Sequence, residues 1–184
     1  QLAEAGSDSE LRFALPDEFD ALLDTLRALG VRHIHFHHLL GHLPLIRDTL
    51  ARRLGVTHDF TAHDYYSACP QISLTTAQKT YCGERGVSQC TACLQERPAA
   101  TQETIDDWRL RHRVFLHQAR YVLTPSADAA VRMQRYFPQA PIRCVPHTDM
   151  LGCQNAPAAP PYTLPAQEHL RVFIVGGLSE IKGG

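Results

Sequence analysis

The sequence has little excess charge of either sign and very little lysine. Its 184 residues include 18 Lys and Arg against 19 Asp and Glu, which gives a formal net charge of −1. Only Lys79 and Lys182 are lysines. A net charge this close to zero lacks the excess of positive charge that is typical of proteins that bind nucleic acid. We therefore expect no nucleic-acid partner.

Long apolar runs are also missing. No stretch approaches the roughly 18 consecutive apolar residues that a membrane-spanning helix needs, so we expect no transmembrane segment. The first residues, QLAEAGSDSE, contain no basic stretch followed by an apolar one, and so lack the pattern of a secretory signal peptide. This start, and a Cys-x2-Cys pair suited to zinc, favour a cytoplasmic protein.

What the sequence does contain is an alternation of extended and helical apolar patterns. Strands are expected at 31–37, 56–62, 121–124 and 142–145, and helices at 16–29, 44–54, 102–119 and 127–136. Strands that alternate with helices indicate βα units and a parallel sheet. We therefore predict an α/β fold, with a Rossmann-like parallel sheet and flanking helices over residues 1–147.

The pattern changes after residue 147. Residues 148–168 are rich in proline and have no period, which predicts a linker. LRVFIVGG (170–177) then reads as a strand followed by a glycine turn, so residues 169–184 are expected to begin a second α/β domain. We interpret the chain as a piece of a longer protein.

Cysteines cluster in a segment of about 65–100, where apolar periodicity fails. The spacing is Cys69-x12-Cys82-x7-Cys90-x2-Cys93, and a Cys-x2-Cys pair is the usual half of a tetrahedral zinc site. Four such ligands leave no open position, so the zinc would be structural. Two disulfides or four free thiols remain alternatives. We expect a Cys-rich insertion without regular structure, and we expect Cys144, on a strand outside it, to be a small core residue.

Histidines alternate along the first predicted strand of the sheet. His33, His35 and His37 are expected on one face, with no carboxylate or cysteine beside them in sequence, so packed histidines are favoured over a metal site. His37 and His38 end the strand, at the sheet edge where parallel sheets bind ligands. Gly41 follows them, and a ligand could approach its backbone closely.

A second polar pair ends the next strand, and a serine follows the one after it. His63 could hydrogen-bond a polar ligand while Asp64 orients it, although two polar residues at a loop entrance would look the same. Ser126 is expected to cap a helix at the same edge, whose free amides could face an anion. On the 102–119 helix, four basic residues are read as a solvated surface: Arg109, Arg111, His112 and Arg113.

Several segments occur in an order that resembles a known family. These are HDYYSACP (63–70), YCGERG (81–86), CTACL (90–94), LTPSADAAVRMQRYFP (123–138), VPH (145–147) and VGGLSEIKGG (175–184). Together they resemble bacterial retaining glycosyltransferases of the GT-B class, often called family 4, and most closely those of polysaccharide or O-antigen biosynthesis. The resemblance covers roughly residues 31–184.

The resemblance implies two Rossmann-like domains facing across a cleft. Residues 1–147 would bind a glycan or lipid-linked acceptor, and the second domain would bind a nucleotide-sugar donor, with retention at the anomeric carbon and no catalytic metal. His63 would reach toward the transferred sugar, with Asp64 in support. Lys182 and Ser126 would face the donor, while Gly177 stands where the family has an arginine. A lipid-linked acceptor would bring the enzyme to the inner face of the membrane as a peripheral protein.

Two other classes of function remain open from the residues. The first is a zinc-stapled α/β module that binds a carbohydrate or a protein without chemistry, which the glycine at position 177 favours. The second is a metal-dependent hydrolase that would use His35, His37 and the His63–Asp64 pair. An acidic donor-binding motif would favour the enzyme, and a metal at the sheet edge would favour the hydrolase.

Overall fold

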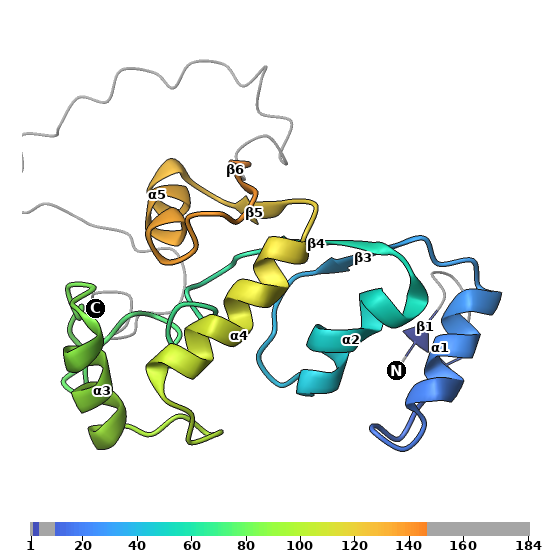
Figure 1. Cartoon of the computed structure of the whole chain (residues 1–184), viewed down its shortest axis with the longest axis horizontal. Helices are drawn as coiled ribbons and strands as arrows, with labels where there is room; N and C mark the ends of the chain where they lie inside the picture. The colour runs from blue at the N-terminus through green and yellow to red at the C-terminus, as the bar shows by residue number, and fades with distance from the viewer. Residues whose placement is uncertain (1, 4–9, 147–184) are drawn as a thin grey trace, which may run out of the picture.

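A four-stranded parallel sheet forms the centre of the fold. The structure, a computed structural model, describes residues 2–3 and 10–146. The strands lie in the order in which they occur along the chain: β3 (His33–Phe36), β4 (Thr57–Thr61), β5 (Val122–Thr124) and β6 (Ile142–Cys144). All three neighbouring pairs are parallel. The predicted Rossmann-like α/β arrangement is therefore confirmed (Figure 1).

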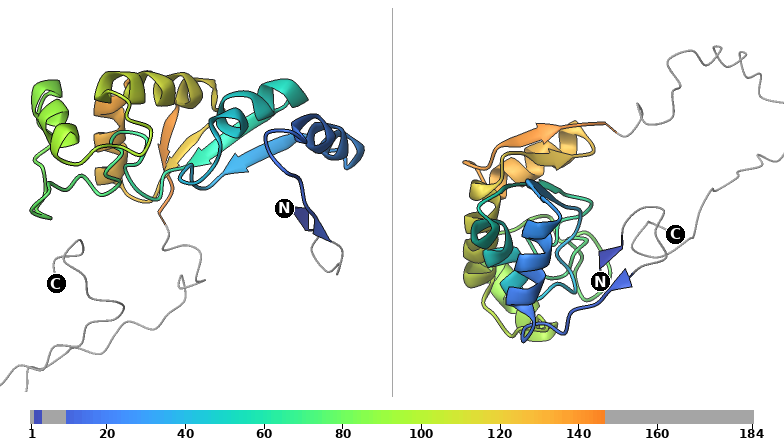
Figure 2. Two further views of the ribbon diagram at one scale, coloured as in Figure 1. Left: turned by 90° about the horizontal axis from the view of Figure 1, so that it is seen from below. Right: turned by 90° about the vertical axis from the view of Figure 1, so that its right-hand side faces the viewer.

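Helices connect the strands. They are α1 (Phe19–Ala28), α2 (Pro44–Leu54), α3 (Val87–Glu96), α4 (Ile105–Gln118) and α5 (Ala127–Tyr136). Crossovers between neighbouring parallel strands are right-handed, which places α2, α4 and α5 on the same face of a sheet whose strands follow in chain order. Figure 2 shows α1, α2 and α4 side by side along one face of the sheet. The two-residue strands β1 (Leu2–Ala3) and β2 (Glu10–Leu11) pair separately and antiparallel.

Three helix boundaries are set by residues that the sequence marks clearly. Pro44 occupies the first turn of α2, and Gly55 ends the helix with a φ of 72°, in the left-handed region where glycine has no Cβ penalty. Ser126 caps α5, since its side chain accepts a hydrogen bond from the backbone N–H of Ala129. The predicted bounds of α2 and the predicted cap of α5 are both confirmed.

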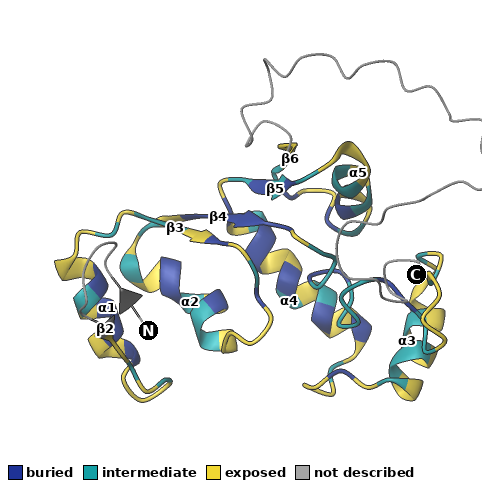
Figure 3. Ribbon diagram, turned by 180° about the vertical axis from the view of Figure 1, so that it is seen from behind, coloured by how far each residue is buried: buried dark blue, intermediate teal, exposed yellow. Residues whose placement is uncertain are grey.

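The core consists of two apolar clusters beneath the helices (Figure 3). One cluster joins the sheet to α4 and α5 and contains Phe36, Phe60, Phe115, Leu116, Val122, Met133 and Phe137. The other joins α1 to α2 through Phe19, Leu22, Leu23, Leu26 and Leu50. In the described part of the chain, no helix is long and apolar enough to cross a membrane.

The segment between β4 and α4 holds more regular structure than expected. It contains α3 and an isolated antiparallel bridge between Thr75 and Tyr81, so the expectation that it has no regular structure is wrong. None of the residues of α3 is buried, as Figure 3 also shows. A helix without a buried face imposes no apolar period on its sequence, which explains why the pattern did not reveal it. The predicted linker and second domain, over 148–184, lie outside the described residues.

Candidate functional site

Two pairs of polar side chains meet at the carboxyl edge of the sheet. Strands β3 and β4 run parallel with Phe36 opposite Phe60, so the residues that follow each strand leave the sheet side by side. His37 Nδ1 lies 3.2 Å from His63 Nε2, and their rings stack with centroids 5.5 Å apart. His38 Nε2 lies 2.5 Å from Asp64 Oδ2. The structure therefore brings together four of the residues that the sequence singled out.

Asp64 holds His38 and the loop that follows β4. Its Oδ1 accepts a hydrogen bond from the backbone N–H of Tyr66 at 2.9 Å, while Oδ2 faces His38. The backbone N–H of Leu40 donates to Nδ1 of His38, which leaves the Nε2–H of His38 to donate to Asp64. His63 is oriented by its hydrogen bond with His37.

A small pocket opens beside these pairs, between the ends of β4 and β5. His63, Asp64 and Ser126 line it, together with Tyr65, Ala62, Pro125, Ala129 and Met133, and its volume is about 160 Å³. This is less than the roughly 300–1,000 Å³ of a typical ligand site. Because Ser126 caps α5, the N-terminal amides and the positive end of the α5 dipole face the same edge.

Gly41 owes its identity to its backbone conformation. Its φ is 82°, a region that residues with a Cβ rarely adopt. A Cβ built on Gly41 would meet no heavy atom within 4 Å. The described residues therefore explain the glycine by the turn after β3 alone, while its closeness to a ligand stays a prediction.

The histidines of β3 alternate as predicted and pair with polar residues of β4. His33 hydrogen-bonds with Thr57 Oγ1 at 2.9 Å and with Asp59 Oδ2 at 3.0 Å. His35 Nε2 lies 2.8 Å from Thr61 Oγ1. Asp59 thus supplies across the sheet the carboxylate that is missing beside these histidines in sequence.

Asp59 is already engaged in an ion pair. Arg120 donates two hydrogen bonds to its carboxylate, at 2.7 and 3.2 Å, and these bonds hold the pKa of Asp59 below its usual range. Within residues 2–3 and 10–146, no group of three or more His, Cys, Asp or Glu side chains is close enough together to hold a metal ion as it stands. The metal-dependent hydrolase therefore gains no support from this edge.

The four clustered cysteines line a single, separate pocket. Cys69, Cys82, Cys90 and Cys93 surround a space of about 210 Å³, and all four are free, partly buried thiols. Burial raises the pKa of Cys69 to about 11, and the other three thiols add to the increase. Cys144 is exposed, so its prediction as a core residue is wrong. It lies on β6, which ends the described sheet, and the sequence pattern did not show that one side of this strand lacks a neighbouring strand.

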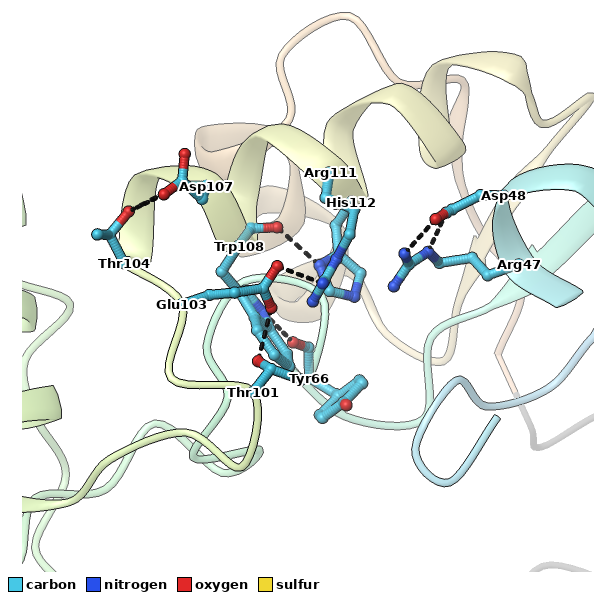
Figure 4. Close-up of polar contacts among 10 residues, drawn as sticks. All are labelled: Arg47, Asp48, Tyr66, Thr101, Glu103, Thr104, Asp107, Trp108, Arg111 and His112. Carbon is cyan, nitrogen blue, oxygen red and sulfur yellow. Dashed lines mark hydrogen bonds and ion pairs between the residues drawn. The ribbon is translucent and has the colours of Figure 1, made fainter. Parts of the chain in front are cut away.

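Helix α4 is not the solvated surface that its basic residues suggested. His112 is fully buried, and Arg111 pairs with Glu103 (Figure 4). Arg109 donates to the carbonyl of Ala68 at 3.0 Å, and only Arg113 of the four is exposed. His112 lies four residues after Trp108 and three before Phe115, so helical spacing on the apolar face was the signal for its burial.

Arg47 is a buried basic residue that sequence reasoning missed. It is 9% exposed and pairs with the neighbouring Asp48, and in Figure 4 its guanidinium points toward His112. Its position three residues before Leu50 placed it on the buried face of α2, which helical spacing could have shown.

Comparisons with known proteins do not assign this chain to a family. The chain matches no family model, no curated protein and no solved structure at a significant level. The arguments that follow rest on the residues described above.

Proposed function

We propose that this chain supplies the acceptor-binding half of a retaining glycosyltransferase of the GT-B class. The observation that carries the proposal is the meeting of the His37–His63 and His38–Asp64 pairs at the carboxyl edge of a parallel sheet, beside the N-terminus of α5. Ligands of open α/β sheets bind outside this edge. The resemblance of HDYYSACP (63–70) and LTPSADAAVRMQRYFP (123–138) to such enzymes involves the loop after β4 and the end of β5 with helix α5.

In this proposal each polar residue at the edge has a different task. His63 hydrogen-bonds a hydroxyl of the sugar being transferred, and the ring of His37 fixes its orientation. Asp64 ties His38 to the loop after β4, which keeps the edge rigid around the acceptor. Preorganised hydrogen bonds of this kind lower a barrier without reorganisation during the reaction. The chemistry needs no metal from this chain.

The remaining partners belong to the same proposal. A nucleotide sugar is the donor, and Lys182, Gly177 and the amides at Ser126 are the proposed donor-side positions; the first two lie outside the described residues. A glycan or a lipid-linked sugar is the acceptor. A lipid-linked acceptor would place the protein in the cytoplasm, at the inner face of the membrane as a peripheral protein.

The test is turnover by the natural full-length protein that contains residues 1–184. UDP-, GDP- and dTDP-sugars are offered with a lipid-linked or glycan acceptor, and sugar transfer is measured for the wild type and for His63→Ala. We expect kcat to fall by a factor of about 10²–10³, as when a preorganised hydrogen bond to the reacting group is removed. His37→Ala is expected to cause a smaller loss, because it removes only the orientation of His63.

His33→Ala is the matched control. His33 begins β3, the strand that His37 follows, but it pairs with Thr57 and Asp59 at the end of the strand away from the His37–His63 pair. This variant is expected to lose stability and keep kcat. Wild-type turnover in His63→Ala would overturn the proposed role of His63. Tight acceptor binding without transfer from any nucleotide sugar would favour the non-catalytic binding module.

A further inference from the structure

The four cysteines that line one pocket come from three separate pieces of chain. Cys69 ends the turn after β4, where its backbone N–H donates to the carbonyl of Tyr65 at 2.9 Å. Cys82 follows the Thr75–Tyr81 bridge, and its N–H donates to the carbonyl of Leu74 at 2.8 Å. Cys90 and Cys93 are three residues apart on α3, so both face the same side of the helix. The placement of all four cysteines around one pocket thus depends on the fold of residues 65–96 as a whole.

Helix α3 has no fully buried apolar side chain. None of its residues is buried, although ten-residue helices are marginal in water without tertiary contacts. The partly buried residues of α3 are Cys90, Cys93 and Leu94, and all three line the same pocket as Cys69 and Ile105. Bonds to the sulfurs of Cys90 and Cys93 would therefore hold α3 in place, which the burial of apolar side chains does not do.

Arginines lie near three of the four thiols, those of Cys82, Cys90 and Cys93. Arg109 reaches across from α4 and donates to Cys90 Sγ at 3.4 Å, and its ring contact with Tyr136 fixes the guanidinium. Arg97 donates to the carbonyls of Thr75 and Thr76, and Arg85 lies beside Gly83 in the turn after Cys82. A divalent ion with four thiolates carries a net charge of −2, which arginines hydrogen-bonded to the sulfurs would offset.

We propose that Cys69, Cys82, Cys90 and Cys93 bind one structural zinc ion that fastens α3 to the turn after β4. Four sulfurs with no imidazole or carboxylate among them form the ligand set that selects zinc or an iron–sulfur cluster. The thiols line the pocket without yet lying within coordinating distance of one another. Zinc would draw them inward to Zn–S distances of about 2.3 Å. Two disulfides would link the sulfurs only in pairs and would give Arg109 no anion to contact.

The first test is the metal content of the purified protein. We expect about one zinc per chain in the wild type, measured by mass spectrometry of the metal after extensive dialysis. Each of Cys69→Ser, Cys82→Ser, Cys90→Ser and Cys93→Ser is expected to lose most of it. Cys144→Ser is the matched control, because Cys144 is an exposed thiol on β6, and it is expected to keep its zinc.

The second test separates the cysteines from the eleven histidines, which could collect metal during purification. Cobalt(II) replaces zinc in the wild type, and the spectrum is expected to show thiolate-to-cobalt charge transfer and the strong visible bands of a tetrahedral site. Removal of zinc from the wild type by a chelator is expected to lower Tm, and added zinc to restore it. This reversal is measured on the intact sequence, so it holds even if a serine variant fails to fold.

Several results would overturn the proposal. One is a wild type that contains no zinc and whose Tm does not respond to zinc. Others are zinc retained in the serine variants, a cobalt spectrum without thiolate bands, bound iron with sulfide, or a mass two or four hydrogens short, which disulfides would cause. None of these results bears on the proposed role of His63, which is tested by turnover.

Discussion

His112 shows how one buried side chain can make the stability of the fold depend on pH. The ring is fully buried, its Nδ1–H donates to the carbonyl of Trp108 at 2.8 Å, and Nε2 has no hydrogen-bond partner among the described residues. Burial lowers the pKa of His112 to about 4 from its usual 6.5. The folded protein therefore keeps this imidazole neutral where an unfolded chain would protonate it.

The sign of the effect follows from which state binds the proton. Below a pH of about 6.5 the unfolded chain takes up a proton that folded His112 refuses, so stability is full above that pH and falls as the pH drops toward about 4. The free energy of unfolding is expected to fall by about 3 kcal/mol between pH 6.5 and pH 4 on account of His112. We expect His112→Phe to reduce this fall, measured as the free energy of unfolding in urea between pH 7 and pH 4. His58 is also buried, with its pKa lowered by burial, and accounts for part of the fall that remains.

Exposed histidines provide the control for this measurement. His42 lies in the exposed loop after β3, so His42→Ala is expected to keep the full wild-type fall in stability. If His112→Phe kept the full dependence as well, the neutral burial of this ring would not be its cause.

At the scale of single elements, the cap of α5 connects stability to the proposed site. Ser126 accepts a hydrogen bond from the N–H of Ala129, and both residues line the pocket beside His63. We expect Ser126→Ala to lower the free energy of unfolding by about 1 kcal/mol, whereas Ser126→Asp retains a cap and most of that stability. Chemical denaturation of the three proteins measures both effects.

A second cap tells the two roles of Ser126 apart. Thr104 caps α4 in the same way, through the N–H of Asp107, but does not line the pocket beside His63. Thr104→Ala should cost a similar amount of stability and leave sugar transfer unchanged, while Ser126→Ala should also reduce transfer. Equal effects of the two variants on transfer would show that Ser126 acts only as a cap.

The elements also show which features a sequence can specify by itself. Helix α2 was predicted at its observed bounds because Pro44 and Gly55 mark its ends through their own backbone preferences. The meeting of His37 with His63 followed from parallel strands that end at one edge. Helix α3 was missed because it has no buried face, and Cys144 was misplaced because its strand ends the described sheet. Helix ends and strand order could therefore be predicted from the sequence. The burial of a residue could not be predicted where it depends on neighbours that are distant in the chain.

On the scale of the whole molecule, α4 joins the sheet to the cysteine-bearing segment. Its Phe115 packs against Phe36 and Phe60 of the sheet, with ring centroids 5.3 and 5.7 Å away. About two turns earlier, Trp108 Nε1–H donates to the carbonyl of Tyr66 at 2.9 Å, and Arg109 donates to that of Ala68. A single helix thus contacts the central core and the turn that carries Cys69.

Trp108 is the only tryptophan of the chain, so its fluorescence reports on that junction. With zinc bound, we expect denaturation followed by Trp108 fluorescence and by far-UV circular dichroism to give coincident transitions, because the segment and the sheet then unfold together. In Cys82→Ser the fluorescence transition should come first, because residues 65–96 loosen around Trp108 while the core at Phe115 still holds the sheet. Cys144→Ser should behave as the wild type does. Coincident transitions in Cys82→Ser would mean that the contacts of α4 alone make the molecule cooperative, and that the cysteines add no coupling between its two parts.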